Sequence, residues 1–524
     1  MRSSVRTARP TDRLSWLWLA IGGALVPFSS IQPSLPFAAW LAPIFFLRFA
    51  RTQRLRVSLP AIALIQSAGL FVNWYIGTNT MLLAISGIVL ALLYTLSYLV
   101  DRLLAPRLAG LTRTLVFPVA ATAIDWLGST IGGAVSGFLL PSLFTAAAAW
   151  DSPAYTQAGN MSLLQIVSVT GIWGLTFLMA WSASVVNELW EHHFHWQPAR
   201  ASVAGLGAML AVVLLFGGAR IAFFPMRSAA VRVAGIVSRE DQFSTIMDMN
   251  PRDLMPGTGA MRAVARERFA PILDDLLTRT EREARSGAKI IVWGEAAAPV
   301  LQEDVAAVVE RAGRVAREQQ VYLQLGLVTF RRSDQFPFME NRALLIEPSG
   351  VIVWDYHKAY PTPGENMSVA AGPRILPIVD TPYGRLAPAI CYDMDFPALI
   401  RQAGTQHVDI VLAPYKDWKQ VAAQHAQMAT LRAIENGVSV VRPSLSGLST
   451  VVDPEGHVLA EVDTFTTDAP TIVAMVPIKG RPTLYARIGD SFAYLCVAGL
   501  MVLAGAALTR RNVGPVIVPQ PAGL

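Results

Sequence analysis

The sequence predicts a multi-pass α-helical membrane domain joined to an α/β domain. The chain is 53% hydrophobic and only 15% charged, apolar runs occupy both of its ends, and strand-like and helix-like patterns alternate between them. A mean hydropathy of +0.42 is typical of membrane proteins. We expect about seven spans within residues 1–219, an extracytoplasmic α/β domain at 220–487, a last membrane helix at 488–511 and a flexible cytoplasmic tail at 512–524.

Eight apolar runs are candidate membrane segments, because about 17–25 apolar residues are needed to cross a bilayer. They are Leu14–Phe28, Leu35–Phe49, Leu59–Ile76, Met81–Val100, Leu115–Val135, Leu163–Val186, Ala201–Gly218 and Phe492–Leu508. The first two are short and interrupted by Pro27, Pro36 and Pro43. They therefore form either a tight pair of spans or a re-entrant hairpin.

The arginines predict the orientation of these segments. They cluster before the first run, after the second, between the fourth and fifth, before the seventh and after the last, whereas loops 77–80 and 134–162 contain no Lys or Arg. Because cytoplasmic loops carry an excess of Lys and Arg, we expect both termini inside and segment 220–488 outside. The formal charge of +6 does not indicate a nucleic-acid partner, since the basic residues form no patch interleaved with aromatics.

The segment between the seventh and eighth runs has the pattern of an α/β domain. Strands are expected at Ala230–Val237, Lys289–Trp293, Val321–Thr329, Ala343–Ile346, Val351–Tyr356, Leu386–Ile390, Val408–Leu412, Val438–Val441, Ser449–Val452 and Thr471–Val476. Helical periodicity appears at Met261–Arg285, Glu303–Gln319 and Val421–Asn436. Turn signals at residues 347–350 and 453–456 predict hairpins. Strands that alternate with helices predict a layered domain.

A carboxylate, an amine and a thiol each follow a strand-like run. Glu295 follows Ile-Ile-Val-Trp-Gly, Lys358 follows Val-Trp-Asp-Tyr-His, and Cys391 follows Ala-Pro-Ala-Ile. Such strand ends can converge at one sheet edge, where these groups could make and break a thioester. Cys391 would be the nucleophile and Glu295 its base, and the Lys358 ammonium would stabilise the thiolate and the oxyanion. Each residue also has a structural interpretation, as a core cysteine, a loop acid and a solvated lysine.

The surrounding sequence resembles the nitrilase superfamily and, within it, the apolipoprotein N-acyltransferase family. The resemblance rests on Cys391-Tyr-Asp-x-x-Phe-Pro, on Thr170-Gly-Ile-Trp-Gly in a membrane segment, on Trp40-Leu-Ala-Pro and on residues 485–490, and it covers nearly the whole chain. It implies a nitrilase-like αββα sandwich for the α/β domain.

The resemblance also implies three supporting site residues. Glu365 is expected to line the site and to orient Lys358, and Tyr392 and Asp393 flank the nucleophile. The acyltransferase family commonly has Glu where Asp393 stands, whereas soluble amidases of the superfamily often have Asp.

Neither metal nor cofactor is expected. The run Glu191-His-His-Phe-His195 lies beside tryptophans at a span end, which is more typical of the headgroup level than of a metal site. No Cys-x-x-Cys, HExxH or phosphate-binding glycine loop occurs. The second of the two cysteines, Cys496, lies in the last apolar run, so a structural disulfide is not expected.

The resemblance implies a monomeric enzyme of the bacterial cytoplasmic (inner) membrane with its catalytic domain on the periplasmic side. It would move a fatty acyl chain from a phospholipid, through a thioester on Cys391, to the N-terminal amine of a diacylglyceryl-cysteine apolipoprotein. The alternative is a membrane-tethered nitrilase-type amidase that acts on a small amide. Asp393 slightly favours it, and so does the first soluble strand, Val231–Ser238, which lacks the usual Gln and Asn of the acyltransferase family. An inactive scaffold in envelope assembly is a third reading, and the intact Glu, Lys and Cys argue against it.

Overall fold

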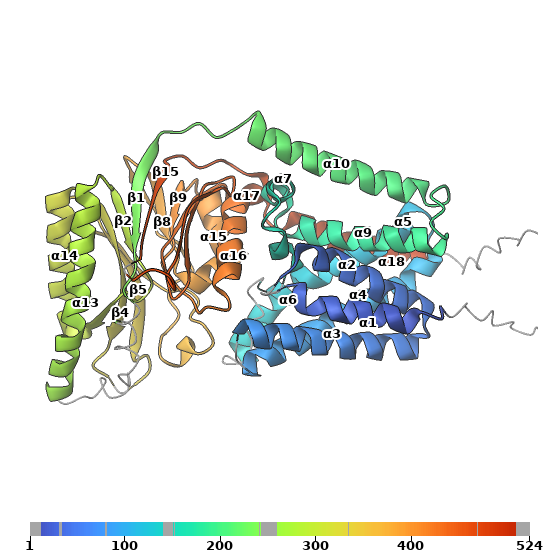
Figure 1. Cartoon of the computed structure of the whole chain (residues 1–524), viewed down its shortest axis with the longest axis horizontal. Helices are drawn as coiled ribbons and strands as arrows, with labels where there is room; N and C mark the ends of the chain where they lie inside the picture. Colours follow the sequence, from blue (N-terminus) through green and yellow to red (C-terminus); the bar gives the residue numbers. More distant parts are fainter. Residues whose placement is uncertain are drawn as a thin grey trace, which may run out of the picture.

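The computed structural model describes residues 12–30, 34–78, 81–139, 150, 152–239, 242, 259–333, 335–468 and 470–509. These residues form a helical bundle and an α/β domain that lie end to end (Figure 1). The tail predicted at 512–524 lies outside the described residues.

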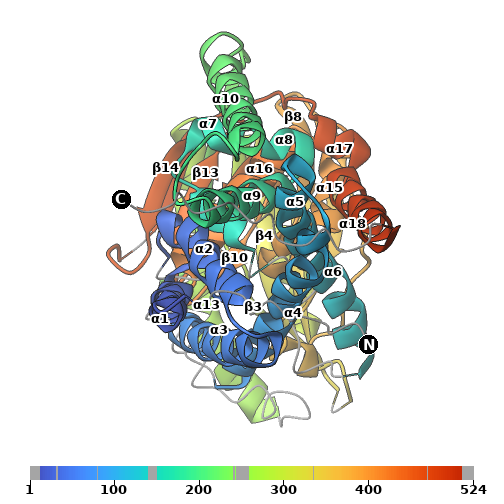
Figure 2. The same ribbon diagram turned by 90° about the vertical axis from the view of Figure 1, so that its right-hand side faces the viewer.

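The bundle contains helices of very different lengths. They are α1 Ser15–Leu25, α2 Pro36–Thr52, α3 Leu55–Thr78, α4 Met81–Leu104, α5 Leu111–Thr114, α6 Val116–Leu139, α7 Met161–Leu164, α8 Val167–Thr170, α9 Trp173–Glu191, α10 Arg200–Ala222 and α18 Ser491–Thr509. Among the described residues, four helices are long and apolar enough to cross a membrane, or five if a bent pair counts as one span. Seen from the bundle side, α10 stands apart from the other helices (Figure 2).

The expectation of one continuous span at Leu163–Val186 is wrong. The chain there forms α7, α8 and α9, and the axis bends by 115° at the break between α8 and α9. Gly171 sits at this break with φ of +64°, a conformation that costs glycine little. The next backbone N–H, of Ile172, donates to Glu435 Oε1 of the α/β domain at 2.9 Å. Because of this bend, the short helices α7 and α8 lie next to the α/β domain (Figure 1).

The α/β domain contains two sheets that face each other (Figure 1). The first has the order β15-β1-β2-β4-β5-β6, with β3 beside β4, and the second the order β14-β13-β11-β9-β8-β7. The strands of the first sheet are β1 Ala230–Ile236, β2 Ile290–Trp293, β3 Ala298–Leu301, β4 Tyr322–Phe330, β5 Met339–Ile346, β6 Ile352–His357 and β15 Thr471–Pro477. Those of the second are β7 Val379–Thr381, β8 Gly384–Pro388, β9 Ile410–Leu412, β11 Ser439–Arg442, β13 Leu448–Val452 and β14 Val458–Asp463. Two short strands, β10 Tyr415–Lys416 and β12 Ser444–Leu445, pair with each other.

Helices cover the outer faces of both sheets. Helices α13 Gly259–Arg285 and α14 Val305–Gln319 cover the first sheet, and α15 Pro397–Thr405 and α16 Ala422–Asn436 lie between the second sheet and the bundle (Figure 1). The domain is therefore the expected αββα sandwich. The small helix α17 Leu484–Ile488 leads from it into α18.

Alternation along the strands builds two separate cores. Ile290 and Val292 of β2 belong to the core between the sheets, whereas Ile291 and Trp293 pack against α13. Neighbouring side chains point to opposite faces of a strand, so a strand that is apolar throughout can serve both cores. Both predicted hairpins are present, because β5 pairs with β6 and β13 with β14 across their turns.

Candidate active site

Three chain turns bring the predicted site residues to the ends of strands. Glu295 lies two residues beyond β2, Lys358 directly follows β6, and Cys391 begins a short 3-10 helix, η6 Cys391–Asp395, after β8. Backbone hydrogen bonds fix the turns: Glu295 donates its N–H to Tyr415 O, Lys358 to Asn341 O and Cys391 to Pro414 O. The structure therefore holds all three residues by backbone contacts to other strands and loops.

The Cys391 backbone is held in an uncommon conformation. Its φ is +47°, in the left-handed region that costs a non-glycine residue on the order of 1–3 kcal/mol. The thiol is buried, and its Sγ lies 3.6 Å from the carbonyl oxygen of Lys416. Strain of this kind persists only where the surrounding contacts over-determine the turn, and it gathers at functional sites.

A hydrogen-bonded cluster of two carboxylates, an amide and an ammonium stands beside the thiol. Lys358 Nζ lies 2.7 Å from Glu295 Oε1 and 2.7 Å from Glu365 Oε2. Asn341 Nδ2 donates to the same Glu295 Oε1 at 2.7 Å and to Glu365 Oε1 at 2.6 Å. Lys358 is 2% exposed and Glu295 4% exposed, so this network is shielded from water and its charge-assisted bonds are strong.

Two oxygens of the cluster have no hydrogen-bond partner among the described residues, Glu295 Oε2 and the amide oxygen Asn341 Oδ1. Glu295 Oε2 is buried and has no hydrogen-bond partner among the residues that the structure describes. A buried carboxylate oxygen without a donor is costly, and such groups mark places where a proton or a ligand is to be received. Glu295 is thus held in place by the hydrogen bonds of Oε1, whereas Oε2 can accept a proton.

The charges of the cluster act on one another and on the thiol. Burial disfavours the Lys358 ammonium, but Glu295 and Glu365 outweigh burial and hold the pKa of Lys358 well above its usual value. Burial would raise the pKa of Glu365, yet Lys358 holds it below its usual value. Burial and the Glu295 carboxylate raise the pKa of the Cys391 thiol well above its usual value, although Lys358 opposes them. The resting site therefore contains a thiol, an ammonium and an ionised Glu365.

Asp393 plays a part that its sequence position does not reveal. Its carboxylate accepts hydrogen bonds from the N–H of Ile390 at 3.0 Å, the N–H of Tyr360 at 2.8 Å and the hydroxyl of Tyr356 at 2.8 Å. Burial raises the pKa of Asp393 to about 7. Asp393 thus ties the end of β6 and the chain after Lys358 to the nucleophile turn.

Tyr392 lies in the same turn as a packing residue. Its ring meets Phe396 edge-on, with ring centroids 5.1 Å apart. Tyr360 stacks on the same Phe396 ring, with the two ring centroids 3.6 Å apart.

Two further residues belong to the site although the sequence did not indicate them. Asn341 is the donor shared by Glu295 and Glu365, and it lies in the polar first half of β5, between Glu340 and Arg342. Lys416 is largely buried near the cluster; burial lowers its pKa, whereas Glu295 and Glu365 oppose that change. Asn341 has a charged residue on each side, so its sequence context gives no signal that marks it as a site residue.

A second cluster has the spacing of metal ligands, and it lies away from this site, between β13 and β14. Among the described residues, Asp453, Glu455 and His457 have ligand atoms close together, in the turn between β13 and β14. Asp453 Oδ1 accepts the backbone N–H groups of Glu455 and His457, and Glu455 Oε1 pairs with Arg481 at 2.5 Å. These contacts account for the cluster as a hairpin turn.

Comparison with known proteins points to one family for both halves of the chain. The family described as "Apolipoprotein N-acyltransferase N-terminal domain" matches residues 22–185, and that described as "Carbon-nitrogen hydrolase" matches residues 254–481. An apolipoprotein N-acyltransferase of Geobacter metallireducens is 26% identical over 96% of this chain and 96% of its own length. One of Rhodopseudomonas palustris is 27% identical over 75% of this chain and 73% of its own length. A solved amidase from Nesterenkonia sp. is 20% identical, with a TM-score of 0.40 over 52% of this chain and 97% of that chain.

Proposed function

We propose that this chain, which belongs to the apolipoprotein N-acyltransferase family, is a bacterial membrane acyltransferase that works through a thioester on Cys391. The donor is a phospholipid, and the acceptor is the N-terminal amine of a diacylglyceryl-cysteine on an apolipoprotein. The observation that supports the mechanism is the buried Glu295 Oε2, the one carboxylate oxygen of the cluster that has no hydrogen-bond partner among the described residues.

In the first half-reaction the proton of the Cys391 thiol passes to Glu295 Oε2 as the sulfur bonds to the ester carbonyl carbon of the phospholipid. Lys358 stabilises the negative charge on the carbonyl oxygen. The C–O bond to glycerol then breaks, the departing oxygen takes the proton from Glu295, and a lysophospholipid leaves. The acyl chain remains on Cys391 as a thioester.

In the second half-reaction the acceptor amine adds to the thioester carbonyl, and Glu295 takes a proton from the amine. The C–S bond breaks, the proton returns to the Cys391 sulfur, and the product is an amide. Glu365 and Asn341 take no part in bond making. They hold Lys358 and Glu295 in place through three contacts of 2.6–2.7 Å.

The catalytic domain belongs on the periplasmic side of the inner membrane. The arginine clusters favour this orientation, and a lipid substrate in the outer leaflet would then lie at the level of the bundle end that adjoins the α/β domain. We propose a monomer that needs neither cofactor nor nucleic acid.

The structure weakens one of the arguments for the amidase alternative. Asp393 was one of two features that slightly favoured it, and the Asp393 oxygens are engaged by Ile390, Tyr360 and Tyr356 inside the protein. Its identity therefore bears on how the turn is held rather than on which substrate enters.

The proposal is tested by trapping the thioester. The purified protein is incubated in detergent with a phospholipid labelled in its acyl chain, and label that hydroxylamine releases is measured. Cys391→Ala should carry none. Cys496→Ala is the matched control, since it removes the other buried thiol and should be labelled like the unmodified protein. Label retained on Cys391→Ala would remove this cysteine from the mechanism.

A further inference from the structure

The segment of residues 414–416, which ends with β10, contacts the base and the nucleophile through three consecutive carbonyl oxygens. Pro414 O accepts the N–H of Cys391 at 2.9 Å, and Tyr415 O accepts the N–H of Glu295 at 3.3 Å. Lys416 O lies 3.6 Å from Cys391 Sγ. Because one piece of backbone holds both turns, its position sets the distance between the proposed base and the thiol.

Asp417, the next residue, fixes this segment in the domain. Its N–H donates to Leu445 O at 2.9 Å, and its Oδ2 accepts from Ser444 Oγ at 2.8 Å and pairs with Arg442. Its Oδ1 lies 2.6 Å from His425 Nδ1. The first three partners belong to strands β11 and β12, whereas His425 is on α16, the helix between the second sheet and the bundle (Figure 1). Of these four contacts, the one with His425 therefore reaches Asp417 from the side of the bundle.

His425 uses its two ring nitrogens for two different partners. Trp150 Nε1 of the bundle lies 2.9 Å from His425 Nε2. An indole N–H can only donate, so Nε2 accepts this bond, and the ring proton is on Nδ1, which donates to Asp417. Asp395 Oδ2 is 3.9 Å from the same Nε2, which is too far for a hydrogen bond. His425 thus links a donor of the bundle to the residue that fixes β10.

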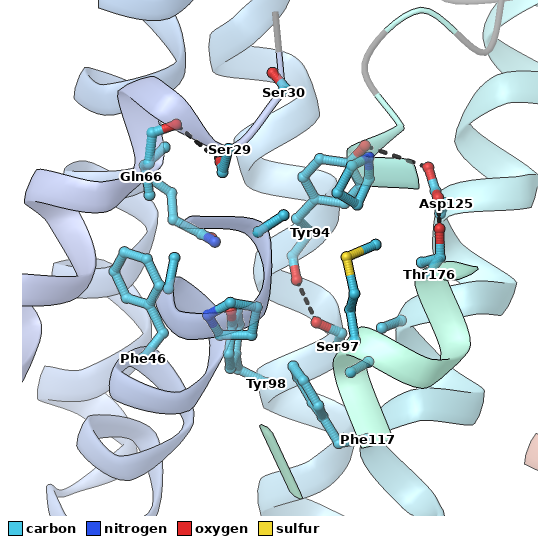
Figure 3. A pocket seen from close by; sticks show the side chains of 18 of the residues that line it. Ser29, Ser30, Phe46, Gln66, Tyr94, Ser97, Tyr98, Phe117, Asp125 and Thr176 are labelled. Carbon is cyan, nitrogen blue, oxygen red and sulfur yellow. Dashed lines mark hydrogen bonds between the residues drawn. The ribbon is translucent and has the colours of Figure 1, made fainter. Parts of the chain in front are cut away.

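Trp150 is itself held by the helices of the bundle. Its ring packs against that of Trp74 on α3, with the ring centroids 5.4 Å apart. Two residues further along the chain, Ser152 donates to Asp125 of α6 at 3.1 Å. Asp125 also accepts from Thr176 of α9 at 2.9 Å, at the edge of a pocket between the helices (Figure 3). The donor end of the link is therefore tied to three helices.

The link is shielded from water. Trp150 is 4% exposed, His425 3% and Asp417 4%. The ring of Trp418 packs beside the other two rings, with centroids 6.3 Å from Trp150 and 6.0 Å from His425. Hydrogen bonds in such an environment are strong, and a buried polar group that loses its partner is costly. The link should therefore resist displacement of β10.

We propose that His425 is a positioning residue for acylation, which together with Trp150 and Asp417 couples the helical bundle to the segment that holds Cys391 and Glu295. This inference rests on the proposed acyl transfer for the reaction that is positioned. A displacement of about 1 Å in a reacting group can cost about 10²-fold in rate. The bundle thus anchors the enzyme in the membrane and also sets the geometry of its site.

Three substitutions in the full chain break the link at different points. Trp150→Phe removes the indole donor and keeps a ring. His425→Asn removes the acceptor of that bond, whereas its shorter amide can still donate to Asp417. His425→Gln can keep the bond to Trp150 and loses the one to Asp417. All are made with Cys496→Ala, so that alkylation of a thiol reports Cys391 alone.

Two reactions are measured for each variant. The first is acyl-enzyme formation from phospholipid, which gives a maximal rate and the phospholipid concentration at half that rate. The second is alkylation of Cys391 by iodoacetamide, which needs no lipid. The matched control is Trp173→Phe, which removes another buried indole donor, one that bonds Asp490 at 2.8 Å.

Trp150→Phe and His425→Asn break the same bond, so each should lower both rates about tenfold, and the double variant should lower them no further. His425→Gln, which releases β10 itself, should lower both rates about 10²-fold. The half-saturating phospholipid concentration should stay unchanged in all of them. Trp173→Phe should lower the unfolding temperature as Trp150→Phe does and leave both rates at the unmodified value, which separates positioning from stability.

Two positions and three substitutions keep the test decisive where one variant fails to fold. Unmodified rates in the folded variants, or single losses that multiply in the double variant, would overturn the link while acyl transfer stands. If the unmodified protein took no acyl chain from phospholipid but Cys391 alkylation followed the expected order, the proposed function would fail and the positioning role of His425 would remain.

Discussion

At the scale of single residues, the two carboxylates of the proposed site differ in one respect. Glu295 and Glu365 both contact Lys358 at 2.7 Å. Only Glu295 keeps a buried oxygen without a hydrogen-bond partner among the described residues. The two carboxylates should therefore differ in what their loss does to the rate.

Glu365→Gln should change the pH dependence of acylation more than its maximum. The two carboxylates hold the pKa of Lys358 well above its usual value, so removing one lets the ammonium lose its proton at a lower pH. The alkaline limb of the acyl-enzyme formation rate should move to lower pH, with a maximal rate within about tenfold of normal. Glu295→Gln, the matched change, should lose on the order of 10²–10⁴-fold at every pH. The measurement is the rate of acyl-enzyme formation from pH 5 to 10 for both variants. If both variants lost the same fraction of the rate and neither shifted the alkaline limb, the two glutamates would not have different roles.

Sequence reasoning reached those site residues that follow an apolar run. Glu295, Lys358 and Cys391 could be picked out because each comes at or just beyond a strand end. Asn341 could not, since its two partners lie 46 and 24 residues away and only the folded chain brings them together. The expected contact between Glu365 and Lys358 is present at 2.7 Å, although the catalytic and supporting roles themselves stay predictions.

At the scale of elements, apolar patterns predicted ten strands of the described residues and missed five that are short or exposed, β3, β7, β10, β12 and β14. Each of the ten expected strands coincides with a strand to within a few residues. Strand β14 was missed because Val458–Asp463 lies at the sheet edge with mostly exposed or half-buried side chains, so no apolar run marks it. The break at Gly171 was missed for a different reason. Its cause is a hydrogen bond to Glu435, 263 residues away.

The nucleophile turn contains an acid whose charge should destabilise the fold. Asp395, the last residue of η6, is fully buried, and neither of its oxygens has a hydrogen-bond partner among the described residues. Burial raises the pKa of Asp395 to about 6, although His425 and Arg432 oppose this. The folded state therefore favours the protonated form, and the stability this provides at acidic pH is lost as the pH rises from about 4 through about 6.

Asp395→Asn should accordingly stabilise the protein at alkaline pH. A pKa raised by about two units corresponds to on the order of 2–3 kcal/mol once the acid is ionised. The variant, which cannot ionise, should unfold at higher temperature or denaturant concentration than the unmodified protein at pH 8. The difference should disappear near pH 4. A variant less stable at pH 8 would mean that the carboxylate makes a favourable contact instead.

At the scale of the whole molecule, the α/β domain is built onto the bundle by buried polar contacts. Trp150 Nε1 donates to His425 Nε2 at 2.9 Å, and Gln165 Nε2 donates to Glu455 O at 2.9 Å. Glu435, which accepts from Ile172, is itself fully buried and paired with Arg432. Separating the two parts would break these hydrogen bonds between the domains, each of which contributes about 0.5–1.5 kcal/mol net.

The α/β domain should therefore fail as an isolated enzyme. A fragment spanning Val231–Pro477 loses the bundle partners of Glu435 and His425, which are the Ile172 N–H and Trp150 Nε1. We expect low stability and no acylation by phospholipid, with activity recovered only in the full chain in lipid or detergent. Thermal unfolding and hydroxylamine-sensitive labelling measure the two effects. A fragment that is stable and hydrolyses small amides at the rate of the full chain would favour the amidase instead.

The central claim is that Cys391 carries an acyl chain between two lipid substrates, and one pulse-chase experiment addresses it directly. The full protein is charged with phospholipid, freed of donor and digested, and the Cys391 peptide is weighed before and after addition of a synthetic peptide with an N-terminal diacylglyceryl-cysteine. The account predicts a fatty acyl mass on this peptide that disappears as an amide appears on the acceptor, while an acceptor with its amine acetylated leaves the mass in place. A small acyl group, or a fatty acyl mass that water removes as fast as the amine does, would contradict it.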